Sequence, residues 1–190
     1  MTVLLEIRWH GRAGQGVKTA AYLLAEAAMD TGKYIQAFPE YGAERSGAPI
    51  AAFTRIGDEP IRIHYGIRTP DVVVVVDESL IGAMDVTSGL KDNGILLVNT
   101  NQSPEIYRAK LPSFHGKIAT VDATQIALDC IGRPIPNIPI MGALIRVSGI
   151  VSLEDLEPRL RHKFSAKFSE QVVEGNVKAL KRGYEEVKIL

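Results

Sequence analysis

The sequence contains a single cysteine, Cys130, among its 190 residues. One thiol forms no disulfide within the chain, and it is too few for an iron–sulfur cluster, which ordinarily takes four thiolates. Cys130 stands in an apolar segment between Ile126 and Ile131. We therefore expect it to be a small buried hydrophobic side chain rather than a reactive or metal-binding group.

The sequence also lacks an excess of either charge, because its 22 basic residues are matched by 22 acidic residues. It therefore has no net field that would attract nucleic acid or an anionic membrane. No apolar run reaches the roughly 18 residues of a membrane-spanning helix, and the start of the chain does not follow the pattern of a secretory signal. We expect a cytoplasmic protein with neither a nucleic acid nor a membrane as a partner.

Histidines are few and scattered, and none are spaced as in a helical metal site. The four are His10, His64, His115 and His162. We expect no metal site. With 46% hydrophobic residues the chain has ample material for a core, and its length fits one domain. We expect a single domain over residues 1–190, with an α/β sheet core over 1–131 and a C-terminal helical extension over 132–190.

A glycine-rich segment, residues 10–16, lies between a β-like apolar run and a helix-like run that begins at Val17. Such a turn brings backbone N–H groups to the amino end of a helix, where the dipole favours an anion. The glycines follow the pattern G-x-x-G-x-G, which is not the dinucleotide pattern, and Val17 separates Gly16 from Lys18, so it is not a Walker A loop. Two interpretations stay open: a phosphate or other anion site, or a turn that needs small residues for packing.

Five consecutive valines between Asp71 and Asp77 show no polar alternation. Such a run is typical of a central parallel strand that is buried on both faces. Apolar runs recur at 94–99 and 117–121, and helix-like segments lie at 78–84, 105–110 and 124–131. The alternation predicts an α/β fold with a mostly parallel, mixed sheet and helices on both faces, in a Rossmann-like arrangement. Ligands of such sheets bind at the carboxyl ends of the strands, where the glycine-rich segment lies.

Between the first helix and the valine strand the pattern predicts antiparallel elements. A second strand is expected at 33–38, followed by a polar loop that runs from Pro39 to Pro49. Segments 50–56 and 61–64 read as a hairpin, because a Gly-Asp-Glu-Pro turn separates them.

The remainder of the chain reads as helical. A proline-rich connector at 132–139 precedes a helix at 141–150, and Ser152 opens another helix with a capping-box-like start. The last helix carries one apolar stripe, made of Val173, Val177, Leu180, Tyr184 and Val187. We interpret this stripe as core rather than as a partner surface.

The loop Glu40–Pro49 holds the adjacent charges Glu44 and Arg45, followed by Ser46. A loop of this length is functional, forms an interface, or is simply solvated. If it shares the rim of the glycine-rich segment, then Arg45 has the chemistry to bind a phosphate or carboxylate there.

Taken together, residues 11–17 and 36–49 resemble the gamma subunit of 2-oxoacid:ferredoxin oxidoreductases, with the pyruvate-oxidising members, pyruvate synthases, as the nearest likeness. The likeness continues through 55–61, 70–78, 94–100, 136–144 and 149–151, and so covers essentially the whole chain. It implies a gamma-type domain over residues 1–190, in a complex that converts a 2-oxoacid, most closely pyruvate, to acyl-coenzyme A and CO2 while reducing ferredoxin in anaerobic metabolism.

The resemblance also implies a division of labour. Thiamine diphosphate and Mg²⁺ would sit in the alpha and beta subunits, and the [4Fe–4S] clusters in the beta and the ferredoxin-like delta subunits. External ferredoxin and coenzyme A would be the other partners. This chain has neither the Gly-Asp-Gly…Asn-Asn thiamine signature nor the cysteines of a cluster. We expect it to supply no catalytic residue and no metal ligand, to be inactive alone, and to help form the coenzyme A site and the subunit interfaces.

The residues expected to contact coenzyme A or a neighbouring subunit lie in the two loops. They are Gly11, Arg12, Gly14, Gln15 and Gly16 in the first loop, and Glu44, Arg45 and Ser46 in the second. Two other functions stay open at this point. One is a stand-alone oxidoreductase that holds NAD or ATP at the glycine-rich segment, and the other is a purely structural scaffold subunit.

Overall fold

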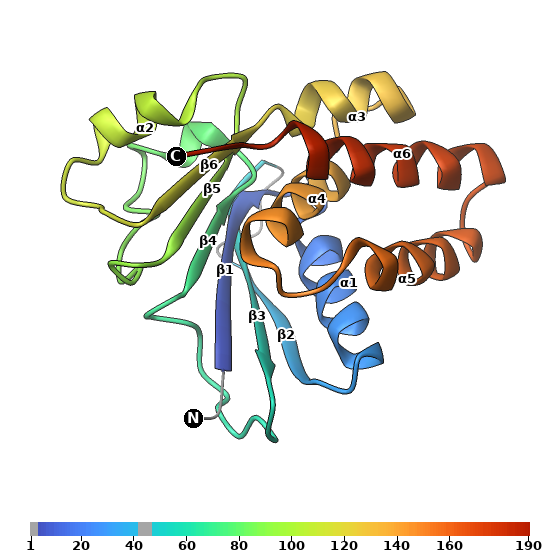
Figure 1. Ribbon diagram of the computed structural model, residues 1–190, viewed down its shortest axis with the longest axis horizontal. Helices are drawn as coiled ribbons and strands as arrows, with labels where there is room; N and C mark the ends of the chain where they lie inside the picture. The colour runs from blue at the N-terminus through green and yellow to red at the C-terminus, as the bar shows by residue number, and fades with distance from the viewer. Residues whose placement is uncertain (1–3, 42–46) are drawn as a thin grey trace.

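The computed structural model describes residues 4–41 and 47–190. Within them one seven-stranded sheet runs in the order β2-β3-β1-β4-β5-β6-β7 (Figure 1). The strands are β1 (Leu4–Arg12), β2 (Tyr34–Tyr41), β3 (Pro49–Gly57), β4 (Val72–Val75), β5 (Ile95–Asn99), β6 (Lys117–Val121) and β7 (Lys188–Ile189). The helices are α1 (Val17–Asp30), α2 (Pro104–Lys110), α3 (Ala123–Ile131), α4 (Asn137–Ser148), α5 (Leu153–Ser165) and α6 (Glu170–Glu186), with a 3₁₀ turn, η1, at Glu78–Leu80.

The sheet is mixed, as the sequence predicts. Strands β1, β4, β5 and β6 are parallel neighbours, while β3 pairs antiparallel with both β1 and β2. The carboxyl ends of the four parallel strands therefore meet at one edge of the sheet. The glycine-rich segment leaves β1 at this edge, where α/β sheets bind their ligands.

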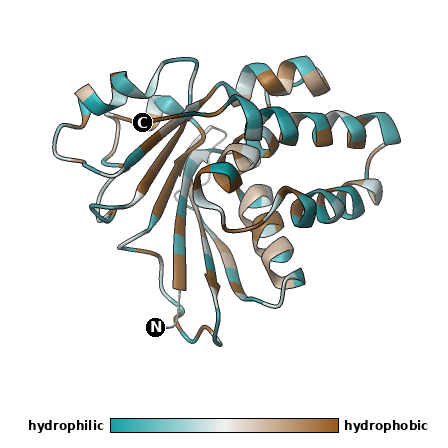
Figure 2. Cartoon of the chain, viewed as in Figure 1, coloured by the Kyte–Doolittle hydropathy of each residue, from teal (hydrophilic) through white to brown (hydrophobic). Residues whose placement is uncertain are grey.

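The valine strand is buried on both of its faces, and this divides the core in two. Val72 and Val74 belong to the larger cluster, which α1 and α3 to α6 build on one side of the sheet. Val73 and Val75 belong to the smaller cluster, which includes Leu80 and Tyr107 on the other side. Helices thus cover both faces, although unequally (Figure 1). Figure 2 shows apolar residues along the central strands and hydrophilic ones on the outer helices.

Helices α4 and α6 approach each other closely because glycines lie where they cross. A Cβ on Gly142 would lie 2.0 Å from the carbonyl oxygen of Leu180, and one on Gly183 would lie 1.9 Å from that of Pro139. Val173, Val177 and Leu180 of α6 are buried in the larger cluster, so the apolar stripe is core, as predicted. This packing also fixes the amino end of α4 beside the glycine-rich segment.

Several predicted elements differ from the structure. Segment 61–64 is not a strand, so the predicted hairpin is wrong, because β3 already pairs with β1 on one edge and β2 on the other. Instead, the Ile63 carbonyl accepts a hydrogen bond from Gln36 and the Tyr65 carbonyl accepts one from Arg55. Strand β2 extends to Tyr41, beyond the predicted end at residue 38.

Two helix boundaries also differ. The helix expected at 78–84 is only the turn η1, and Gly82 with φ 94° follows it. Helix α4 begins at Asn137 rather than 141, because Pro139 lies in its first turn, where a missing N–H costs nothing. Cys130 is half-buried and packs against the larger cluster, rather than being fully buried. No helix in the described residues has the length and apolar character needed to cross a membrane.

Candidate functional site

The glycine-rich segment is a turn whose conformation requires glycine. Gly14 has φ 96°, and Gly16, which precedes the first turn of α1, has φ 76°, a region that side chains disfavour. A Cβ on Gly16 would lie 2.4 Å from Nδ2 of Asn137, and one on Gly11 would lie 2.5 Å from Cγ2 of Val17. Close packing therefore accounts for Gly11 and Gly16. It does not account for Gly14, which has open space around its Cα.

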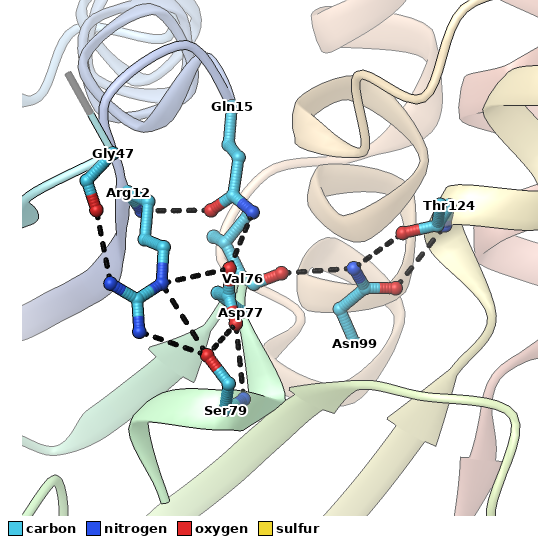
Figure 3. Close-up of polar contacts among 8 residues, drawn as sticks. All are labelled: Arg12, Gln15, Gly47, Val76, Asp77, Ser79, Asn99 and Thr124. Atoms are coloured by element: carbon cyan, nitrogen blue, oxygen red, sulfur yellow. Dashed lines mark hydrogen bonds and ion pairs between the residues drawn. The ribbon is translucent and has the colours of Figure 1, made fainter. Parts of the chain in front are cut away.

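Arg12 and Gln15 fasten the segment to the end of β4 through Asp77 (Figure 3). The Gln15 side chain accepts a hydrogen bond from the Arg12 N–H at 2.8 Å and donates one to Asp77 Oδ2 at 2.7 Å. The Arg12 guanidinium lies 3.4 Å from Asp77 Oδ2 and also donates to the Ser79 hydroxyl at 3.0 Å. Its charge is thus already partly neutralised, and the side chain keeps about a third of its surface exposed.

Asp77 is held in its charged form. Burial alone raises the pKa of this carboxyl, but hydrogen bonds from Ser79 and Gln15 and the charge of Arg12 together outweigh it. The pKa of Asp77 therefore lies below its usual value. The charges of Arg12 and Asp77 neutralise each other in this network, so the Arg12 guanidinium is held in one position.

The second loop meets the first through its last residues, Gly47 and Ala48. Arg12 Nη1 donates to the Gly47 carbonyl at 3.0 Å, and the Ala13 N–H donates to the Ala48 carbonyl at 3.3 Å. The two loops therefore share one rim, as predicted. Glu44, Arg45 and Ser46 lie outside the described residues, so their predicted contacts stay predictions.

Sequence reasoning missed a polar crevice at the carboxyl edge of the sheet. Asn99 lies at its centre and joins three elements: its side-chain amide donates to the Val76 carbonyl and the Thr124 hydroxyl, and accepts from the Thr124 N–H (Figure 3). The crevice, about 290 Å³, is lined by Gln15, Asp77, Glu78, Asn99, Asn101 and Asp122, among others. The signal was present, because Asp77, Asn99 and Asp122 stand at the ends of successive parallel strands.

The described residues contain no group of three or more His, Cys, Asp and Glu side chains that could hold a metal ion. His10 lies deep in the sheet against Arg8 and is only 8% exposed. The site thus offers backbone amides, a restrained guanidinium, carboxylates and hydrogen-bonding side chains.

Comparison with known proteins decides the family. The model of the family described as pyruvate ferredoxin/flavodoxin oxidoreductase matches residues 6–186. The chain belongs to this family. The resemblance to 2-oxoacid:ferredoxin oxidoreductases read from the two loops is therefore confirmed.

Two curated members of the family are similar over nearly their whole length. Pyruvate synthase subunit PorC of Thermotoga maritima is 58% identical over 96% of this chain and 94% of that protein. The common gamma subunit of the pyruvate/ketoisovalerate oxidoreductases of Pyrococcus furiosus is 50% identical over 98% of both chains. The crystal structure of the Thermotoga maritima pyruvate oxidoreductase subunit PORC superposes with a TM-score of 0.87, at 56% identity over 98% of both chains. These relatives are subunits of oxidoreductase complexes, and the α/β fold is the one that this family shares.

Proposed function

We propose that this chain is the gamma subunit of a cytoplasmic pyruvate:ferredoxin oxidoreductase complex, which converts pyruvate and coenzyme A to acetyl-coenzyme A and CO2 while reducing ferredoxin. The observation that carries the proposal is the 58% identity to a pyruvate synthase subunit over almost the full length of both chains. The match spans almost the whole of both chains rather than one motif, which favours a shared role in the assembly.

In this proposal the bond-breaking chemistry belongs to the partner subunits. Thiamine diphosphate, with Mg²⁺, supplies the carbanion stabilisation for decarboxylation there, and iron–sulfur clusters in the beta and delta subunits carry electrons. The residues of this chain fit neither group, since it has one cysteine and its described part offers no metal-binding cluster. In this proposal the residues of this chain bind and orient coenzyme A.

The glycine-rich segment is proposed to contact coenzyme A, whose phosphates are multiply anionic. The first turn of α1 presents N–H groups without helical acceptors, and its dipole favours negative charge. Gly14 leaves open space at that turn. Asp77, Ser79 and the Gly47 carbonyl hold the Arg12 guanidinium in place, so Arg12 adds positive charge with little entropic cost on binding.

Replacing Arg12 by Ala in the assembled complex tests this role. We expect the KM for coenzyme A to rise about tenfold, as for the loss of one charge-assisted contact, while the KM for pyruvate stays unchanged. Arg62→Ala is the matched control, because Arg62 is exposed in a segment remote from the loop. An intact complex with an unchanged KM for coenzyme A contradicts the contact, and loss of assembly favours a purely structural subunit.

The stand-alone alternative has its own test. The isolated chain is expected to show no turnover with pyruvate and no reduction of NAD. Adding alpha, beta and delta subunits is expected to restore ferredoxin reduction. If the isolated chain bound NAD with micromolar affinity and reduced it, the proposed function would be wrong.

A further inference from the structure

A short apolar turn, residues 81–84, follows η1 on the surface of the molecule. Its residues are Ile81, Gly82, Ala83 and Met84, so it carries neither a charge nor a polar side chain. Met84 is 41% exposed, although it is a large apolar side chain. Gly82 has φ 94°, and no described atom lies within 4 Å of the position that a Cβ would take there. The apolar turn therefore faces open space.

The apolar turn is fixed at both of its ends. Leu80 before it is 1% exposed and Val86 after it is 3% exposed, and both belong to the smaller cluster. The Met84 N–H donates to the Leu80 carbonyl at 3.1 Å, and a β-bridge joins Ile81 to Met84. The buried Arg8 guanidinium donates to the Val86 carbonyl at 3.0 Å. Because the apolar turn is already ordered, it loses little conformational entropy when a partner covers it.

Carboxylates stand on both sides of the apolar turn in the sequence. Glu78 precedes it and Asp85 follows it; both are exposed, and neither forms an ion pair with another described residue. Asp85 acts electrostatically on Arg8, but Arg8 is only 8% exposed, so a partner meets the carboxylate rather than the guanidinium. Glu78 also lines the polar crevice together with Asp122, and the described lining of that crevice contains no lysine or arginine. The surface beside the apolar turn therefore favours cations.

These charges disfavour a second copy of this chain as the partner of the apolar turn. In a two-fold dimer the same patch meets itself, so Glu78 and Asp85 would face their own counterparts. Like charges opposite one another in a contact that excludes water repel each other strongly. A pocket that is apolar inside and basic at its rim meets no such cost. The apolar turn therefore fits a different protein chain.

The position of the apolar turn indicates which chain this is. The Ser79 hydroxyl, on the turn η1 just before it, accepts a hydrogen bond from the Arg12 guanidinium at 3.0 Å and donates one to Asp77 (Figure 3). The apolar turn thus adjoins the network that positions Arg12. In the proposed function the reacting atoms lie in the thiamine-bearing subunits, so these subunits must approach Arg12 for coenzyme A to reach them. A subunit that approaches this rim also meets the apolar turn.

We propose that the apolar turn anchors a thiamine-bearing subunit of the complex, with Met84 in an apolar pocket of that subunit and Glu78 facing its basic rim. The inference rests on the proposed function, which supplies the partner. Protein interfaces concentrate their affinity in a few side chains that become fully buried. Methionine suits this role because its flexible side chain adapts to a pocket and because it is enriched at interfaces.

Titration of the full chain into the assembled alpha, beta and delta subunits tests the anchor by calorimetry. Met84→Glu places a charge in the proposed pocket and Met84→Ala empties it, so we expect both to weaken binding at least about tenfold. Met84→Leu keeps the apolar volume and is expected to bind within about threefold of wild type. Met29→Glu is the matched control, because Met29 is 49% exposed and lies at the carboxyl end of α1, away from the glycine-rich segment.

Ionic strength separates the charged contact from the apolar one. Glu78→Gln keeps an acceptor for the Tyr107 hydroxyl but removes the charge. We expect it to weaken binding about threefold at low salt, and its difference from wild type to disappear in about 0.5 M salt. The loss caused by Met84→Ala is expected to remain at both ionic strengths, because salt does not screen an apolar contact. With the chain in saturating excess, the Met84 variants are expected to keep the wild-type KM for coenzyme A, because the apolar turn contacts a subunit and not the substrate.

Other outcomes contradict the anchor. Wild-type affinity of Met84→Glu and Met84→Ala would do so, and so would an equal loss in Met29→Glu; if the wild-type chain still restores ferredoxin reduction, the proposed function stands. A wild-type dimer in solution that Met84→Glu disperses would assign the apolar turn to a second copy instead. If the wild-type chain neither binds the other subunits nor restores ferredoxin reduction, the proposed function fails together with the anchor.

Discussion

Inside the sheet, Nε of Arg8 donates a hydrogen bond to Nε2 of His10, 3.0 Å away. Both side chains are only 8% exposed. The rest of the guanidinium donates to the carbonyls of Val86 and Ser88 and, at 3.5 Å, of Ile67. A buried arginine thus uses a neutral histidine as an acceptor. Its hydrogen bonds to the carbonyls of Val86 and Ser88 hold β1 to the segment that follows η1.

This arrangement makes stability depend on pH. Burial, followed by the charge of Arg8, lowers the pKa of His10 from 6.5 to about 4. The unfolded chain therefore binds a proton that the folded chain excludes, and folding weakens as the pH falls from 6.5 towards 4. From pH 7 to pH 5 we expect this histidine to reduce the free energy of unfolding by about 2 kcal/mol.

Urea unfolding of the chain and of His10→Gln at the two pH values measures this contribution. Glutamine keeps an acceptor for Arg8 but does not titrate, so the variant is expected to lose about 2 kcal/mol less than wild type over that interval. His162→Gln, at an exposed position, is expected to behave like wild type. Equal pH dependence of wild type and His10→Gln would contradict the buried neutral histidine.

The two glycines at the amino end of α1 are predicted to differ when substituted. Gly14→Ala meets only the cost of a positive φ, about 1–2 kcal/mol, because nothing lies within 4 Å of the new Cβ. Gly16→Ala bears a similar backbone cost and also forces the Asn137 side chain aside. Urea unfolding is expected to rank Gly16→Ala as clearly less stable than Gly14→Ala. Equal stability of the two variants would show that the Asn137 side chain moves aside at no cost.

The sequence was most informative where one physical effect dominates. The valine strand could be predicted because burial on both faces of a parallel strand demands an unbroken apolar run. The turn at residues 11–16 could be predicted because only glycine adopts its backbone freely. Segment 61–64 misled for the opposite reason: its β-branched residues resemble a strand, but the edge they would pair with is taken by β2.

The cavities on the two sides of the glycine-rich segment were not equally predictable. The carboxyl edge of the sheet follows from topology, and Asp77 could be placed there from the sequence alone. The cavity on the other side of Gly16 could not, because its lining brings together Gly16, Asn137 from α4 and Asn176 from α6. Those contacts depend on the close α4–α6 crossing, which long-range packing determines and no local pattern reveals.

Breaking the ion pair between Arg55 of β3 and Glu6 of β1 is predicted to lower the free energy of unfolding strongly. Arg55 is fully buried, and its guanidinium donates to Glu6 at 2.8 Å, to Gln36 at 2.7 Å and to the Tyr65 carbonyl at 2.8 Å. Arg55→Met leaves Glu6 without its ion-pair partner, so we expect a loss of about 3–5 kcal/mol in the free energy of unfolding.

An exposed pair supplies the control. Lys33 and Asp58 each keep 44% of their side-chain surface exposed, so Lys33→Met is expected to cost less than about 1 kcal/mol. The double variant Glu6→Gln/Arg55→Met is expected to recover part of the loss, because no charge is then left unpaired. If Arg55→Met were as mild as Lys33→Met in urea unfolding, the pair would contribute little to the fold.

Asp77 is predicted to hold the glycine-rich segment by its charge rather than by its shape. Asp77→Asn keeps the shape but turns one acceptor of the Gln15, Ser79 and Arg12 donors into a donor. We expect the free energy of unfolding at pH 7 to fall by about 1–3 kcal/mol, and the KM for coenzyme A to rise because Arg12 loses its restraint. Ser79→Ala, which removes a hydroxyl but leaves the charge, is expected to have a smaller effect on both.

The pH dependence separates charge from shape at this residue. Because the folded pKa of Asp77 is lowered, its contribution is fully present above the unfolded value near 3.9 and is lost only as the pH falls through the folded pKa. The difference in the free energy of unfolding between wild type and Asp77→Asn should therefore stay constant from pH 7 to pH 5 and become smaller below about pH 4. The His10 contribution is common to both chains and cancels from the difference. A gap that already narrowed between pH 7 and pH 5 would mean that Asp77 titrates at a raised pKa, and the closed network with Arg12 and Gln15 would then be wrong.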